Sequence, residues 1–152
     1  MTVELFRDDG YRTECSATVT AVTGDGGVML DQTVFYPTGG GQPGDSGVLV
    51  TGVGERIRIV TTGYQDGQLV HVPAPDQTSP AIGDTVTCRI DWDRRHRLMR
   101  MHTAMHLLCS VVPCGVTGGQ VGESKSPLDF DVGDTVLDNA QLTEALTALV
   151  ET

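Results

Sequence analysis

The stretch DWDRRHRLMRMHTAMHLLCSVV, residues 91–112, contains neither glycine nor proline and predicts one long helix. Asp91 or Asp93 can cap its first turn, because a short carboxylate side chain accepts hydrogen bonds from the exposed amides there. Pro113 and Gly115 follow directly and are expected to end the helix. Short strand-like segments separated by turns precede residue 91 and give way there to this helix. The helix therefore marks the start of a second domain.

Two histidines, His102 and His106, stand four residues apart inside this predicted helix. Residues with that spacing lie one above the other on the same helical face. Histidines placed in this way are a recurrent zinc half-site, whereas the alternative is two polar residues on the flank of a helix. His96, Cys109 and Cys114 lie nearby, but none completes a second pair with metal-binding spacing. The sequence therefore predicts half of a metal site.

Residues 1–90 predict six or seven short strands separated by turns. Apolar and polar residues alternate along residues 15–22 and 85–90, which is the period of a strand with one buried face. Asp25-Gly26 and Asp66-Gly67 are typical of hairpin turns. Frequent short strands of this kind indicate a small β-barrel or a sandwich.

Residues 91–152 predict a long helix, two strands and a second helix. The strands are expected at residues 118–123 and 128–132. Asp138 can cap the second helix, whose apolar face is formed by Leu142, Leu146, Leu149 and Val150. The fold class is therefore α+β, with a barrel domain over 1–90 and an incomplete α/β domain over 91–152.

The net charge of −10, from 20 acidic and 10 basic residues, makes the chain a poor general nucleic-acid binder. Five of the ten basic residues nevertheless fall between residues 89 and 100. They predict either a local phosphate-binding surface or a solvated helix face balanced by neighbouring acids. The candidates for contact with a tRNA backbone are Arg94, Arg95, Arg97 and Arg100.

The N-terminus lacks the basic and then apolar layout of a signal peptide, and no apolar run approaches the ~20 residues of a membrane span. A soluble cytoplasmic protein without a membrane partner is expected. The four cysteines are then expected to be free thiols, with Cys15 and Cys88 packing as small hydrophobic residues.

A glycine-rich segment, Phe35-Tyr36-Pro37-Thr38-Gly39-Gly40-Gly41-Gln42-Pro43-Gly44-Asp45, lies between the predicted strands. Successive glycines allow backbone N–H groups to approach a ligand closely. The segment is neither a Walker loop nor a dinucleotide fingerprint. It is therefore either a ligand-binding loop or a tight barrel loop.

Three segments together resemble the alanyl-tRNA editing family, which comprises the editing domain of alanyl-tRNA synthetases and the free-standing AlaX-type proteins. The first is residues 31–45, which look like the family's glycine-rich loop. The second is Arg100-Met101-His102-Thr103-Ala104-Met105-His106-Leu107-Leu108, which matches its first zinc half-site. The third is residues 119–131, which look like the hairpin that follows. Their order and spacing agree over most of residues 14–150.

The resemblance implies a barrel followed by an α/β editing domain of the threonyl/alanyl-tRNA synthetase type. It implies an ATP-independent, zinc-dependent hydrolase that removes serine or glycine from alanine-specific tRNA in trans and so supports translation fidelity. It places His102 and His106 as Zn²⁺ ligands and Gln120 as a catalytic residue near the aminoacyl group. It also places a substrate-binding loop near the acceptor end, formed by Thr38, Gly39, Gly40, Gly41 and Gln42.

Two departures from the family pattern bear on the site. The second zinc half-site, Cys-x-x-x-His, does not occur in these 152 residues, so the remaining ligands are expected beyond Thr152. Family members often carry Thr where this chain has Met105, so discrimination of the serine hydroxyl is expected to rest on other groups. The residues alone also leave open a non-catalytic module that binds tRNA or a partner, or a different metal-dependent ester hydrolase.

Overall fold

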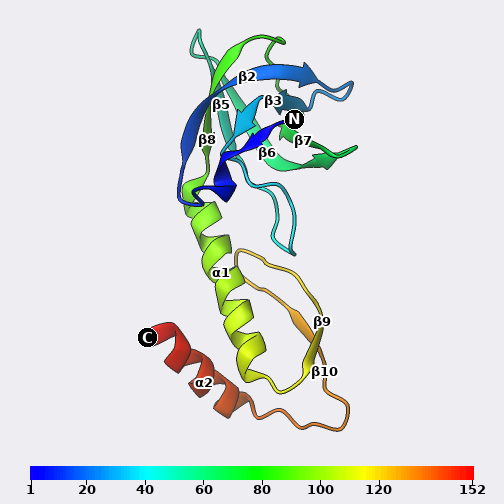
Figure 1. Ribbon diagram of the computed structural model, residues 1–152, viewed down its shortest axis with the longest axis vertical. Helices are drawn as coiled ribbons and strands as arrows, with labels where there is room; N and C mark the ends of the chain where they lie inside the picture. Colours follow the sequence, from blue (N-terminus) through cyan, green and yellow to red (C-terminus); the bar gives the residue numbers. More distant parts are fainter. The chain divides into compact units, whose positions relative to one another are not determined.

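Six antiparallel strands close into a barrel in the N-terminal part of the chain (Figure 1). The computed structural model describes residues 1–152, which form two compact units, Met1–Arg95 and His96–Thr152. The order of strands around the barrel is β2-β3-β7-β6-β5-β8. Their bounds are β2 Glu14–Val22, β3 Val28–Leu30, β5 Gly47–Thr51, β6 Arg56–Gln65, β7 Gln68–Pro73 and β8 Thr85–Ile90. The predicted barrel is confirmed, whereas the domain boundary predicted after residue 90 stays a prediction.

Three short elements accompany the barrel. Strands β1 (Val3–Glu4) and β4 (Gln32–Thr33) pair in parallel, and the 3₁₀ turn η1 (Leu5–Arg7) follows β1. The turn between β6 and β7 has positive φ at both Asp66 and Gly67, which is the geometry that a two-residue hairpin requires. The Asp-Gly pair therefore forms the turn that its sequence predicted.

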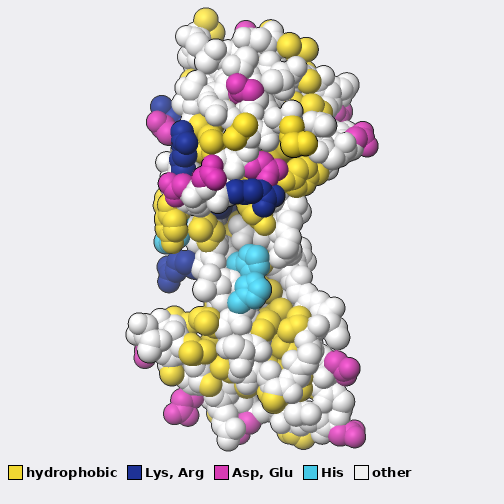
Figure 2. All heavy atoms as spheres, in the orientation of Figure 1, with side chains coloured by type: hydrophobic (Ala, Val, Ile, Leu, Met, Phe, Trp, Pro, Cys, Tyr) yellow, Lys and Arg dark blue, Asp and Glu magenta, His cyan; other side chains and the backbone are white.

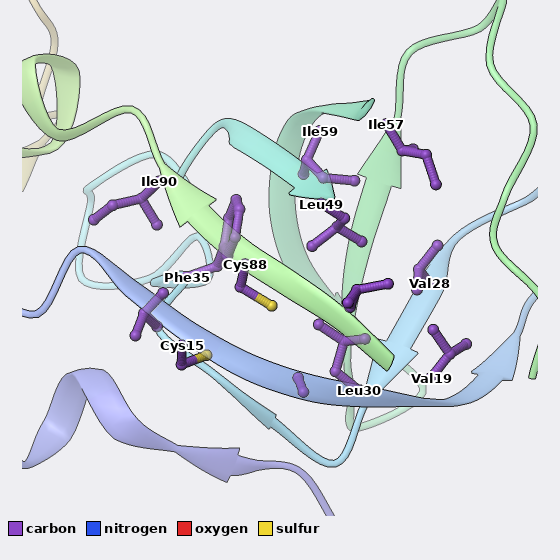
Figure 3. Packing of buried hydrophobic residues seen from close by; sticks show 13 residues of the cluster. Cys15, Val19, Val28, Leu30, Phe35, Leu49, Ile57, Ile59, Cys88 and Ile90 are labelled. Carbon is purple, nitrogen blue, oxygen red and sulfur yellow. The ribbon is translucent and has the colours of Figure 1, made fainter. Parts of the chain in front are cut away.

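The barrel core is formed by inward-facing residues of β2, β3, β5, β6 and β8, together with Val34 and Phe35 (Figure 3). Along β2, Cys15, Ala17 and Val19 are buried while the residues between them are more exposed, as the alternating pattern predicted. Full burial of an aliphatic side chain stabilises the fold by roughly 1.5–3 kcal/mol. The fully buried aliphatic residues here are Val19, Val28, Leu30, Val34, Leu49, Ile57, Ile59 and Val86.

Helix α1 (Trp92–Val111) begins where the sequence predicted. The Asp91 Oδ1 accepts from the backbone N–H of Arg94 at 3.1 Å, so Asp91 and not Asp93 caps the first turn. Neither helix of the structure combines the length and the apolar composition of a membrane-spanning segment.

The second unit contains the hairpin of β9 (Gly115–Gly119) and β10 (Leu128–Asp131), followed by helix α2 (Asn139–Glu151). The strand predicted at 118–123 was wrong over most of its length. Gly122 donates its N–H to Ser126 Oγ at 3.0 Å, and Gln120 donates to the Pro127 carbonyl at 3.1 Å. These bonds fold residues 120–127 into the hairpin loop, so the strand ends earlier.

Candidate functional site

The glycine-rich loop is a small closed hairpin in the first unit. At its base Asp45 donates its N–H to the Tyr36 carbonyl at 2.8 Å, while the Tyr36 N–H donates to Asp45 Oδ2 at 2.8 Å. At its tip Gly39 and Gln42 exchange two backbone hydrogen bonds of 3.0 Å. Gly40 and Gly41 between them have φ values of 59° and 78°, which side-chain-bearing residues rarely adopt. Gly40 and Gly41 therefore serve turn geometry.

Strand β6 holds the loop in place through Thr62. The Thr38 N–H donates to the Thr62 carbonyl at 2.9 Å, and Thr62 Oγ1 donates to the Asp45 carbonyl at 3.0 Å. Gly44 lies so close to this strand that a Cβ there would stand 1.8 Å from the Thr62 oxygen. Of the residues predicted to bind substrate, Gln42 is buried and Thr38 bonds to β6, whereas Gly40 and Gly41 form the exposed tip.

The base of the loop contains a buried ion pair between Asp45 and Arg95. Their side chains are 1% and 3% exposed, and Arg95 Nη1 donates to Asp45 Oδ2. The guanidinium also lies 5.4 Å from the centre of the Tyr36 ring, as in a cation–π contact. Burial raises the pKa of the Asp45 carboxyl, although the Arg95 charge acts in the opposite direction. The sequence predicted that Arg95 contacts a tRNA backbone, whereas the structure buries this side chain against Asp45.

The other predicted arginines differ in their surroundings. Arg94 is partly buried, and its Nη1 donates to the Gly44 carbonyl at 2.9 Å. Arg97 and Arg100 are exposed on α1. A role for Arg94, Arg97 and Arg100 at a tRNA backbone stays a prediction.

Sequence reasoning overlooked a buried histidine beside the loop. His71 on β7 is 0% exposed, with Thr33 Oγ1 2.8 Å from its Nε2 and the Val28 carbonyl 2.9 Å from its Nδ1. A carbonyl can only accept, so Nδ1 carries the proton and Nε2 accepts from Thr33. Thr33 Oγ1 in turn accepts from the Phe35 N–H at 3.0 Å. Burial lowers the pKa of His71 to about 4, so the imidazole is neutral. Through Thr33 it holds the Phe35 backbone, directly before the loop, in place.

His102 and His106 come together on α1 in the second unit. Their ring centroids are 5.0 Å apart and their planes differ by 22°, so the imidazoles are stacked. Histidine side chains lie together on the face drawn in Figure 2, next to hydrophobic and uncharged surface. Partial burial, and to a lesser degree the His106 charge, lower the pKa of His102 and favour the neutral form that binds metal.

The donor set of this pair fits one half of a zinc site. Imidazole nitrogens are common zinc ligands, and a complete site takes three or four protein ligands. Nowhere in residues 1–152 do three or more His, Cys, Asp or Glu side chains gather closely enough to hold a metal ion. Cys109 and Cys114 are partly buried free thiols.

Met105, on the same helix, belongs to a small apolar cluster. It is 8% exposed and groups with Leu98 and Val121, with Met101 and Leu128 packed against them. Met105 therefore stabilises the second unit by packing. Gln120 is exposed directly after β9, and its predicted catalytic role stays a prediction.

Comparison with known proteins shows that the chain is similar to tRNA synthetases and to alanyl-tRNA editing proteins. Residues 3–94 match the family described as tRNA synthetases class II (A). The chain is 42% identical over 141 residues to the alanyl-tRNA editing protein AlaX-M of Methanosarcina acetivorans, covering 87% of this chain and 58% of that protein. It is 37% identical over 137 residues to the AlaX-M protein of Saccharolobus solfataricus, covering 87% and 57%.

An alanine–tRNA ligase of Caldivirga maquilingensis is 45% identical over 107 residues, which are 70% of this chain and 12% of that enzyme. The chain spans somewhat more than half the length of the AlaX-M relatives that it matches. The match over residues 3–94 covers the whole barrel and the first turn of α1, and the AlaX-M alignments extend well beyond it. The chain therefore belongs to the class II (A) tRNA synthetase family and is a relative of the alanyl-tRNA editing proteins, as its three sequence motifs predicted.

Proposed function

We propose that the protein hydrolyses the ester bond between a wrongly attached amino acid, serine or glycine, and alanine-specific tRNA. The main support is the similarity to AlaX-M proteins over 87% of the chain, since these relatives are named alanyl-tRNA editing proteins. Editing is needed because a binding pocket rejects a near-isosteric amino acid by only ~10²-fold, so some tRNA molecules receive the wrong amino acid. A separate hydrolytic site then removes the errors.

The proposed reactive centre contains His102 and His106. Their stacked imidazoles, 5.0 Å apart on one helix, would hold a Zn²⁺ ion together with ligands from outside this pair. When bound, zinc lowers the pKa of water toward ~7 and stabilises developing negative charge on an ester oxygen. The two imidazoles would fix the position of the ion, and partial burial of His102 favours its neutral state.

The proposed tRNA contacts lie on separate parts of the chain. The loop tip at Gly40 and Gly41 exposes backbone without side chains, which allows close approach of an acceptor end. Arg97 and Arg100 are exposed on α1 and would neutralise phosphates. With a net charge of −10, the protein needs such local positive charge to bind tRNA.

A substrate panel tests this proposal. The purified protein is incubated with seryl-, glycyl- and alanyl-tRNA specific for alanine and with small amino-acid esters. Faster hydrolysis of the seryl or glycyl substrate than of alanyl-tRNA is expected. Hydrolysis of the small esters but of no aminoacyl-tRNA would instead indicate a different ester hydrolase.

A second candidate function is a non-catalytic tRNA-binding module. It is favoured by the presence of only two clustered ligand side chains, His102 and His106, where a zinc site needs more. Metal analysis separates the two functions. One zinc per chain, lost in His102→Ala, supports the hydrolase, whereas tRNA binding without bound zinc and without hydrolysis supports the binding module.

A further inference from the structure

Two consecutive arginines join the glycine-rich loop to the first turn of α1, all within the first unit. Arg94 donates to the Gly44 carbonyl, and Arg95 donates to the Asp45 carboxylate. The same Asp45 oxygen, Oδ2, accepts from the Tyr36 N–H at the other end of the loop. One carboxylate oxygen therefore connects both ends of the loop to the helix.

Arg95 reaches further segments of the chain as well. Its Nη1 lies 3.5 Å from the Val34 carbonyl, its Nη2 donates to the Gly10 carbonyl at 3.4 Å, and its guanidinium faces the Tyr36 ring. A planar guanidinium with five donors can serve several acceptors at once, whereas a lysine ammonium cannot reproduce this geometry. Arg95 thus fixes the start and the end of the loop together.

The burial of this pair is costly in free energy. Asp45 Oδ1 is buried and has no hydrogen-bond partner. A buried ion pair recovers its desolvation cost only with excellent geometry, and well-packed apolar residues are often as stable. Stability alone is therefore a weak reason for the pair, whereas defining one loop conformation accounts for its geometry.

We propose that Asp45 and Arg95 are positioning residues, which hold the Tyr36–Asp45 loop in the one conformation that binds the acceptor end of the tRNA. This inference rests on the proposed function. The loop is short and doubly closed, by Tyr36 with Asp45 at the base and by Gly39 with Gln42 at the tip. Loosening the base is therefore expected to displace the exposed glycines Gly40 and Gly41 at the tip.

The test uses Arg95→Lys and Asp45→Asn in the purified protein. Lysine keeps the positive charge but lacks the planar set of donors of the guanidinium. Asparagine keeps an acceptor for the Tyr36 N–H but lacks the negative charge. Arg7→Lys is the matched control, because Arg7 pairs with Glu4 at the surface of the first unit, where the Arg7 side chain is 67% exposed, and it lies outside the cluster of arginines between residues 89 and 100. Such a surface pair contributes little to stability.

Three quantities are measured for each variant: amide exchange, affinity for uncharged alanine-specific tRNA, and KM and kcat for seryl-tRNA. Both loop variants are expected to exchange the Gly39 and Gln42 amides about tenfold faster, the size of one lost charged hydrogen bond. The Kd and KM are expected to rise by a similar factor while kcat changes less than twofold. The control should match the wild-type protein.

Tyr36→Phe provides a variant that leaves the ion pair intact. It removes only the hydrogen bond of 3.0 Å from the Tyr36 hydroxyl to the Gly39 carbonyl, so faster exchange at the tip and a raised Kd are expected even if a charge variant fails to fold. Loop amides that exchange only with global unfolding, or an unchanged Kd, would overturn the inference. If the wild-type protein binds tRNA but does not hydrolyse seryl-tRNA, the proposed function fails, while exchange and Kd still decide the positioning role.

Discussion

Lowering the pH from 7 to 4 is expected to destabilise the barrel through His71. This imidazole is 0% exposed and is neutral in the native state, because its Nε2 accepts from Thr33 and burial lowers its pKa to about 4. In the unfolded chain the same group has its ordinary pKa of about 6.5. Between these values the unfolded state binds a proton that the native state does not, so stability falls as the pH falls.

The size of the effect follows from the two pKa values. A difference of about 2.5 pKa units, at 1.36 kcal/mol per unit, amounts to roughly 3 kcal/mol between pH 7 and pH 4. The native free energy of a domain is only about 5–15 kcal/mol, so this loss is a large share of it. The contribution is fully present above pH 6.5 and is lost as the pH approaches 4.

Urea unfolding at a series of pH values measures how the free energy of unfolding changes with pH. The unfolding is monitored by far-UV circular dichroism and by the fluorescence of Trp92, the only tryptophan. His71→Gln is the matched variant, because glutamine keeps a donor and an acceptor but does not titrate. It should be less stable than the wild-type protein at pH 7 and should lose about 3 kcal/mol less on going to pH 4. Carboxyl groups such as Glu4 and Asp25 titrate in both proteins and cancel in the difference. An equal loss in both proteins would refute the assignment of a buried neutral imidazole.

Three further substitutions, one of them with a matched control, have expected effects on stability. Gly44→Ala should cost about 3 kcal/mol or more in urea unfolding, because its Cβ would stand 1.8 Å from the Thr62 oxygen, whereas Gly52→Ala, with open space around it, should change stability by less than about 1 kcal/mol. Met105→Ala should destabilise the second unit by roughly 2–5 kcal/mol, seen as loss of amide protection there, because it removes a buried side chain from a small cluster. Asp138→Ala should cost about 1 kcal/mol and reduce helical circular dichroism, because Asp138 accepts from the first amides of α2. Equal effects of the two glycine substitutions would contradict the close approach of Gly44 to Thr62. Full amide protection in Met105→Ala would contradict the packing role of Met105, and unchanged helicity in Asp138→Ala would contradict the cap.

The features that the sequence predicted well are those set by local periodicity. The alternation around Cys15 and Cys88 placed β2 and β8 correctly, and the two residues are direct partners across the pair of strands. The Asp138 cap and the Asp66-Gly67 turn also follow from local side-chain and backbone preferences. Such preferences depend on residues close in sequence and are visible without the fold.

The features that escaped prediction depend on contacts between residues far apart in sequence. Arg95 was expected at the surface with its neighbours, but its partner Asp45 is 50 residues away. His71 and Thr33 are 38 residues apart, and no spacing pattern connects them. The end of β9 is set by loop hydrogen bonds around Gly122 that no strand pattern reveals. The histidine pair was visible because a helix alone brings i and i+4 together.

The most direct test of the editing function is single-turnover hydrolysis of seryl-tRNA specific for alanine, with wild-type enzyme in excess and His102→Ala in parallel. Rapid release of serine by the wild-type protein is expected, with a loss of about 10²-fold or more in the variant, since the proposed site depends on both imidazoles. Intact folding of the variant is checked by circular dichroism. Serine release at the same rate by both proteins would contradict a reactive centre at His102 and His106, and no release by the wild-type protein would contradict the editing function itself.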